Sequence, residues 1–157
     1  MSCGIALSIA LSLASPDVAQ AAAQPAVAPA APLSVAEEPL FADIVARSTA
    51  LKILVDGWSQ RRAADAEFFA GQAFSGFKAQ AQELADLDMQ GHLVLKDRGT
   101  DNDLKCILRG ISEDLPRKIA AVQSAPDAAE RAVALSELSH LLNDNAEVIT
   151  SPPQPEV

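Results

Sequence analysis

Two histidines, each with a carboxylate one helical turn before it, come closest to the spacing of a metal site in this chain. Glu137 lies three positions before His140, and Asp88 lies four positions before His92. Glu-x-x-His is the spacing of di-iron carboxylate bundles, but those sites need the motif twice, together with two further glutamates. This chain has it once. Helical periodicity also places His140 well away from the apolar face of its segment, so we favour a solvated face and treat all four residues as weak metal candidates.

Haem ligation has no stronger basis in the sequence. Covalent attachment is excluded because the sequence has no C-x-x-C-H motif. Met89 with His92 or His140 is the available non-covalent ligand pair, but neither histidine lies in an apolar stripe. We therefore expect no cofactor.

Cys106 is the one cysteine outside the first few residues. At 100° per residue it lies about 200° around the helix from Leu104, away from the apolar stripe. We favour a packed, inert thiol, because free cysteines are often buried. An odd cysteine in an exported protein also indicates an intermolecular disulfide, and a catalytic or metal-binding thiol is the least favoured interpretation.

Five of the six aromatic residues fall within twenty positions, near two glycines. They are Trp58, Phe68, Phe69, Phe74 and Phe77. One interpretation is an apolar pocket for a hydrophobic ligand at one end of the fold. We favour ordinary packing at a corner between helices, since aromatic side chains usually serve the core.

Catalytic and nucleic-acid-binding patterns are missing from the sequence. It has no G-x-S-x-G, no phosphate-binding glycine loop, no H-E-x-x-H and no cysteine pair for thiol–disulfide exchange. The chain has 21 acidic and 12 basic residues, which gives a formal net charge of −9. Nucleic acid and anionic membrane surfaces need a concentrated basic face, so both are poor partners. We therefore expect that the chain is not an enzyme.

The start of the chain is typical of an exported protein. A short apolar run, Gly4–Ala14, precedes small residues with A-x-A cleavage sites after Ala21 or Ala23, although no Lys or Arg precedes the run. The run is too short for stable membrane insertion. We predict a signal peptide over residues 1–21, a disordered Ala/Pro-rich linker over 22–37, a helical domain over 38–150 and a disordered tail over 151–157. The mature protein would then be periplasmic or secreted.

Between these ends the apolar residues recur every three to four positions, which is typical of amphipathic helices. The first stripe holds Leu40, Ile44, Ser48, Leu51, Leu54, Val55 and Trp58. The second holds Phe77, Ala81, Leu84, Leu87 or Asp88, Gly91 and Leu95. The third holds Leu104, Ile107, Leu108, Ile111, Leu115, Ile119 and Val122, and the fourth holds Ala128, Leu135, Leu138, Leu142, Ala146 and Ile149. We therefore predict an all-α fold, a small antiparallel up-down four-helix bundle.

The segment from Asp56 to Gly76 leaves two alternatives open, because its three glycines lower helical propensity. The first helix either runs on to about Ala70 or stops near Gly57. We favour the longer helix, because it gives four helices of more nearly matched length.

The remaining helix ends carry local signals. Thr100 with Asp103 has the spacing of a capping box at the start of the third helix. Pro116 should bend or shorten that helix, and the fourth helix should start at Ser124.

The favoured function is a non-catalytic exported bundle that acts through protein–protein contacts, with an unknown partner or with a second copy of itself. The alternative is a carrier of a small apolar ligand, haem or a metal ion within the bundle. An enzyme is the least favoured class, because no nucleophile–base pair can be named.

Overall fold

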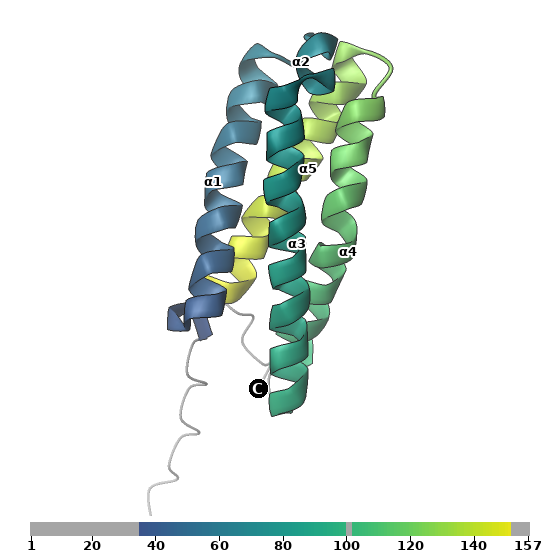
Figure 1. Ribbon diagram of the computed structural model, residues 1–157. Coiled ribbons are helices and arrows are strands. Elements are labelled where there is room, and N and C mark those ends of the chain that lie inside the picture. The colour runs from purple at the N-terminus through teal and green to yellow at the C-terminus, as the bar shows by residue number, and fades with distance from the viewer. Residues whose placement is uncertain (1–34, 100–101, 152–157) are drawn as a thin grey trace, which may run out of the picture. The chain divides into compact units, whose positions relative to one another are not determined.

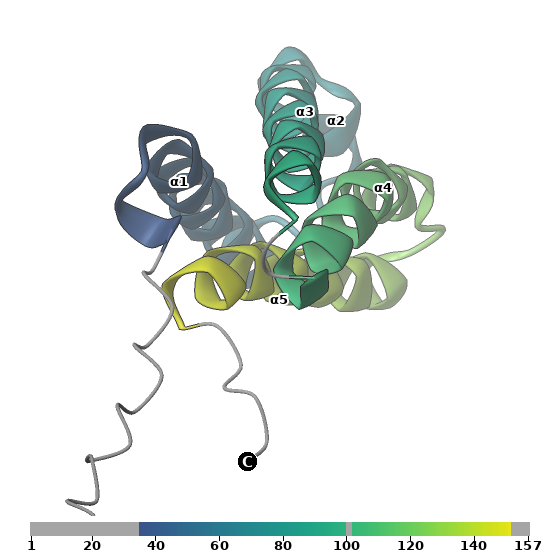
Figure 2. The same ribbon diagram turned by 90° about the horizontal axis from the view of Figure 1, so that it is seen from below.

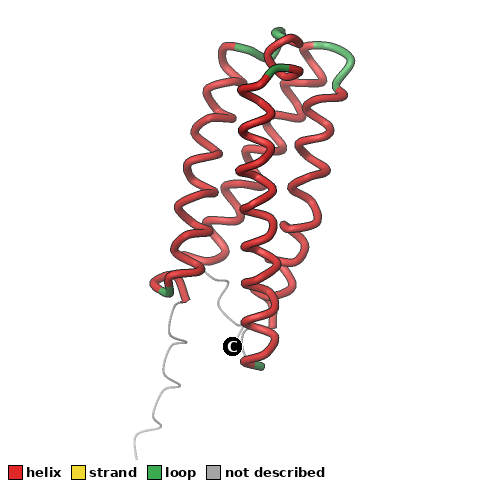
Figure 3. Tube along the Cα trace, in the orientation of Figure 1, coloured by secondary structure: helices red, strands yellow, loops and turns green. Residues whose placement is uncertain are grey.

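The computed structural model describes residues 35–99 and 102–151, and the elements within them are all helical (Figure 3). They are η1 (Val35–Glu37), α1 (Pro39–Arg61), α2 (Ala66–Ala70), α3 (Gln72–Arg98), α4 (Asn102–Ser124) and α5 (Ala128–Thr150). The predicted all-α bundle is therefore confirmed. The predicted signal peptide, most of the linker, Thr100 and the tail after residue 151 lie outside the described residues.

The four long helices run in alternating directions. In Figure 1, α1 rises from η1, α3 descends, α4 rises and α5 descends. The end-on view of Figure 2 shows them in the order α1, α3, α4, α5 around a common centre, so α1 is diagonal to α4 and α3 is diagonal to α5. The most extensive packing joins α3 to α4 and α1 to α5, and the short α2 packs against α3 and α4 at one end. Of the helices described, none has the long apolar stretch that is needed to cross a lipid bilayer.

The core follows the predicted stripes with a few changes. On α3 the buried position is Asp88, and Leu87 is only half-buried. On α1, Leu54 is 43% exposed, so its predicted place in the core is wrong, and Phe41 is fully buried instead. Ala128, placed inward by its phase, is exposed in the first turn of α5.

The prediction that the first helix continues to about Ala70 is wrong. α1 ends at Arg61, and the Asp65 side chain then caps α2 by accepting a hydrogen bond from the main-chain nitrogen of Phe68 at 3.0 Å. Along a continuous helix Trp58 and Phe69 would be about 16 Å apart, whereas their ring centroids are 6.2 Å apart. Burying these rings against each other outweighs the helical hydrogen bonds that the turn removes.

Three helix boundaries also differ from the sequence-based expectations. Val35–Glu37, assigned to the linker, form η1, which packs partly against the core. α4 continues through Pro116 to Ser124, so the proline does not shorten it. α5 begins after Asp127 and not at Ser124, because the Asp127 side chain caps it by accepting from the main-chain nitrogen of Glu130 at 2.9 Å.

Candidate functional site

The aromatic residues of the predicted pocket come together at the α2 end of the bundle. The Trp58 ring lies at their centre, with its centroid 4.8–6.2 Å from those of the four phenylalanines and with edge-on geometry. Phe69, Phe74 and Phe77 are at most 2% exposed. The rings therefore pack directly on one another, as in an aromatic core. A ligand pocket among them stays a prediction.

Two of the pockets in the described domain lie elsewhere. One of about 360 Å³ lies where α4 ends and α5 begins, and Pro126, Val133 and Glu130 are among its lining residues. One of about 150 Å³ lies beside Pro116, between α3 and α4. Neither pocket is lined by a residue of the aromatic cluster.

The four weak metal candidates are not brought together. Asp88 is buried in the core, whereas the Nδ1 of His92 donates to the main-chain oxygen of Lys105 at 2.7 Å. Glu137 and His140 are exposed on α5, where Glu137 pairs with a lysine of α4 at 2.8 Å. Across residues 35–99 and 102–151, no three His, Cys, Asp or Glu side chains gather closely enough to hold a metal ion.

Cys106 is exposed on α4, so the favoured interpretation of a packed thiol is wrong. Its helical phase, away from the apolar stripe, explains the exposure. A disulfide to a second chain stays a prediction. Because α4 is diagonal to α1 (Figure 2), such a bridge would leave the outer side of α1 free.

Three polar side chains lie at one level of the core, and we call them the polar layer: Ser48 of α1, Asp88 of α3 and Asn145 of α5. All three are 0% exposed. The Nδ2 amide of Asn145 donates to Oδ2 of Asp88 at 3.0 Å, which joins two diagonal helices. Gly91 lies one turn below Asp88 on α3, and Ile44 lies one turn below Ser48 on α1. A Cβ at Gly91 would lie 3.5 Å from Cδ1 of Ile44, so these two positions are level. Since α1 and α3 are antiparallel, Ser48 lies level with Asp88.

The electrostatics of the polar layer are set by burial. Burial raises the pKa of Asp88 to about 7, and the hydrogen bond from Asn145 opposes only part of that rise. Three oxygens of the layer have no hydrogen-bond partner in the described structure: Oγ of Ser48, Oδ1 of Asp88 and Oδ1 of Asn145.

Sequence reasoning places Ser48 and Asp88 in apolar stripes but does not identify Asn145. Asn145 follows Leu142 by three residues and precedes Ile149 by four, so its phase predicts burial. A polar residue at a position where helical periodicity predicts an apolar one is the pattern that identifies Asn145.

α1 also presents a charge-free face to solvent, opposite its core stripe. We call it the α1 outer face: Ala42, Ala46, Thr49, Ala50, Ile53 and Gly57. Gly57 is half-buried and the others are exposed, with Ile53 at 66%. Single exposed apolar residues need no explanation. On this face the uncharged residues follow one another over about four turns of the helix.

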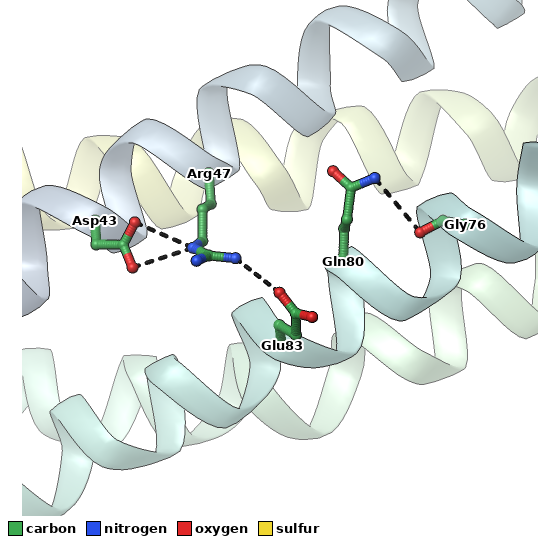
Figure 4. A network of polar contacts seen from close by, with 5 residues as sticks. All are labelled: Asp43, Arg47, Gly76, Gln80 and Glu83. Atoms are coloured by element: carbon green, nitrogen blue, oxygen red, sulfur yellow. Dashed lines mark hydrogen bonds and ion pairs between the residues drawn. The ribbon is translucent and has the colours of Figure 1, made fainter.

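Ion pairs border the α1 outer face on both sides. Toward α3, Nε of Arg47 lies 3.1 Å from Asp43, and its Nη1 lies 2.9 Å from Oε2 of Glu83 (Figure 4). On the other side, Lys52 lies 2.7 Å from Asp56, and its hydrogen bond is the main reason that the pKa of Asp56 is lowered. Arg47 and Lys52 are thus already paired within the chain. A third cation lies at the end of the face: the guanidinium of Arg61 covers Gly57, where a Cβ would lie 2.8 Å from its Nη2.

Comparison of the chain with protein-family models, with curated proteins and with solved structures finds no match. Function is therefore inferred from the chain's own core and surfaces. The α1 outer face and the polar layer are the two features to explain.

Proposed function

We propose that this chain is an exported, non-catalytic helical bundle that works by binding a helix of another protein along the α1 outer face. The observation that supports it is the charge-free strip on α1, with Ile53 66% exposed. Covering apolar surface contributes about 25 cal/mol per Å². Export is supported by the apolar run and the A-x-A sites in the first 23 residues.

The size of the α1 outer face favours a single helix as its occupant. From Ala42 to Gly57 the strip is about 24 Å long and a helix is about 10 Å wide, which gives a footprint of about 240 Å². A stable interface between two folded domains needs about 800 Å² from each partner. The face therefore suits one amphipathic helix, packed beside α1 in a weak or transient complex.

The side chains of the face define the chemistry of that helix. Ala42, Ala46 and Ala50 recur every four residues, so a partner helix can approach the backbone of α1 closely. Ile53 supplies a large side chain to insert between residues of the partner. Because Arg47 and Lys52 beside the face are already paired, the partner needs an uncharged apolar stripe from Ala42 to Ile53. The guanidinium of Arg61 covers Gly57 and limits the stripe at that end.

Site-specific photo-crosslinking in the native host tests the contact. A photoreactive residue at position 50 should give one discrete cross-linked species, whereas the same residue at Ala79, exposed on α3, should give none. Adding Ala46→Glu should lower the yield from position 50 at least tenfold, because a carboxylate would have to be buried in the contact.

The outcomes separate the alternatives. An absence of cross-linked species at position 50, or equal yields from positions 50 and 79, would contradict the contact. A species of twice the mass of the chain would show that the occupant is a second copy and not a different protein.

The mass of the mature protein, isolated from its host without reductant, tests export. Loss of about the first 21 residues supports export, and a full-length mass would count against it. The same spectrum reports whether Cys106 links two chains.

A further inference from the structure

The polar layer is short of a hydrogen-bond donor. A carboxylate and an amide oxygen only accept hydrogen bonds, so Oδ1 of Asp88 and Oδ1 of Asn145 cannot satisfy each other. The hydroxyl of Ser48 donates to neither of them. Buried polar atoms in native proteins are almost always hydrogen-bonded, so an ionised Asp88 leaves this layer incomplete.

A proton on Asp88 supplies the missing donor. The carboxyl and the amide are already joined through Nδ2 of Asn145 and Oδ2 of Asp88 at 3.0 Å. A neutral carboxylic acid keeps that bond, gains an O–H donor and carries no charge. The protonated layer therefore has one more donor than the ionised layer and no buried charge.

The groups that face Asp88 do not favour its charge. At this level the described residues of the packed helices are Ile44, Ser48 and Leu51 of α1, Leu108 and Ile111 of α4, and Leu142, Asn145 and Ile149 of α5. None of them is titratable or charged. His92, one turn further along α3, donates to the main chain of α4, and α2 packs at the aromatic end of the bundle.

We propose that the polar layer is a proton-controlled switch of bundle stability: a proton on Asp88 stabilises the layer, and its loss leaves a buried charge beside the hydrogen bond that joins α3 to α5. One proton is bound or released, and no covalent bond changes. The proposal is independent of the contact on the α1 outer face.

The direction of the pH dependence follows from the two states of the carboxyl. In the unfolded chain the pKa of Asp88 has its ordinary value of 3.8, and in the folded chain it is about 7. The folded protein therefore binds the proton more tightly, so the stabilisation is complete below about pH 4 and is lost as the pH rises through about 7.

Urea unfolding at several pH values tests the switch, with Asp88→Asn as the variant and Asp86→Asn, exposed on the same helix, as the control. Between pH 5.5 and 8.5 the unfolding equilibrium constant of the native chain should rise about 30-fold. Asp88→Asn keeps the shape of the neutral acid and a permanent donor, so its unfolding constant should change much less. Asp86→Asn should behave like the native chain.

A native chain whose stability is constant or increases over this range would overturn the proposal, as would an Asp88→Asn variant with an unchanged pH dependence. Carbon NMR titration of the Asp88 carboxyl in the native chain gives an answer even if the variant fails to fold. A midpoint near 7, shared by the side-chain amide resonances of Asn145, supports the switch. A midpoint in the ordinary acidic range would refute it.

Discussion

Replacing Arg131 with methionine tests how the α2 end of the bundle is held together. Arg131 is 5% exposed, and its guanidinium donates from Nη1 to the main-chain oxygen of Ala63 at 2.9 Å and from Nη2 to that of Ala125 at 2.8 Å. It therefore joins the loop after α1 to the loop before α5, and it lies 5.5 Å from the ring of Phe69. Methionine keeps an apolar stem and removes both hydrogen bonds.

The expected change in the free energy of unfolding is the difference between two effects. Hydrogen bonds from a charged donor contribute about 1.5–3 kcal/mol each. Ala63 and Ala125 are half-buried, so water can partly replace the donor, and the lower value gives a loss of about 3 kcal/mol for the pair. Methionine also removes a buried charge whose Nε has no partner in the described structure, which returns about 1–2 kcal/mol. We expect the free energy of unfolding to fall by about 1–2 kcal/mol.

Urea unfolding followed by the fluorescence of Trp58 measures this loss, because the Trp58 ring lies 6.2 Å from that of Phe69. Arg117→Met is the matched control, since Arg117 is exposed on α4 and pairs only with Asp114 at the surface. It should leave the midpoint nearly unchanged. An unchanged or raised free energy of unfolding in Arg131→Met would show that the two loop hydrogen bonds contribute nothing net, and would refute the reasoning.

Three further substitutions follow from local geometry, each measured by thermal unfolding. Gly91→Val should lower the free energy of unfolding by about 1–3 kcal/mol, because a Cβ there would already lie 3.0 Å from Cδ1 of Leu108. Gly110→Ala, with open space around its Cβ in the middle of α4, should raise it by about 1 kcal/mol, and a loss there would contradict the packing. Asp127→Ala removes the cap of α5 and should cost about 1 kcal/mol, whereas Asp144→Ala on the same helix should cost far less.

The helices and most of the core could be predicted because helical periodicity depends on local sequence. The exact rotation of α1 could not be predicted. Leu54 and Val55 are neighbours 100° apart on α1, and only Val55 is buried. Which of them faces inward depends on the packing of α1 against α5, which a stripe on one helix does not contain.

The break after Arg61 could not be predicted from propensity. Ala63, Ala64 and Ala66 favour a helix, and the apolar phase continues to Phe69. The competing effect is the burial of Phe69 and Phe74 against Trp58, which needs the chain to turn back. Long-range aromatic packing therefore ends α1 at Arg61, although the local residues alone favour a continuous helix.

The Asp88–Asn145 pair of the polar layer could be predicted from helical phase and depth together. A polar residue in the phase of an apolar stripe is a candidate for burial, and a buried polar group needs a partner at the same depth. α3 and α5 both start at the aromatic end of the bundle and run in the same direction. Asp88 lies 16 residues after the first residue of α3, and Asn145 lies 17 after the first of α5, so both are about 25 Å down their helices. Depth along parallel diagonal helices therefore pairs these two residues once the helix starts are known. The start of α5, expected at Ser124, lies at Ala128, four residues later.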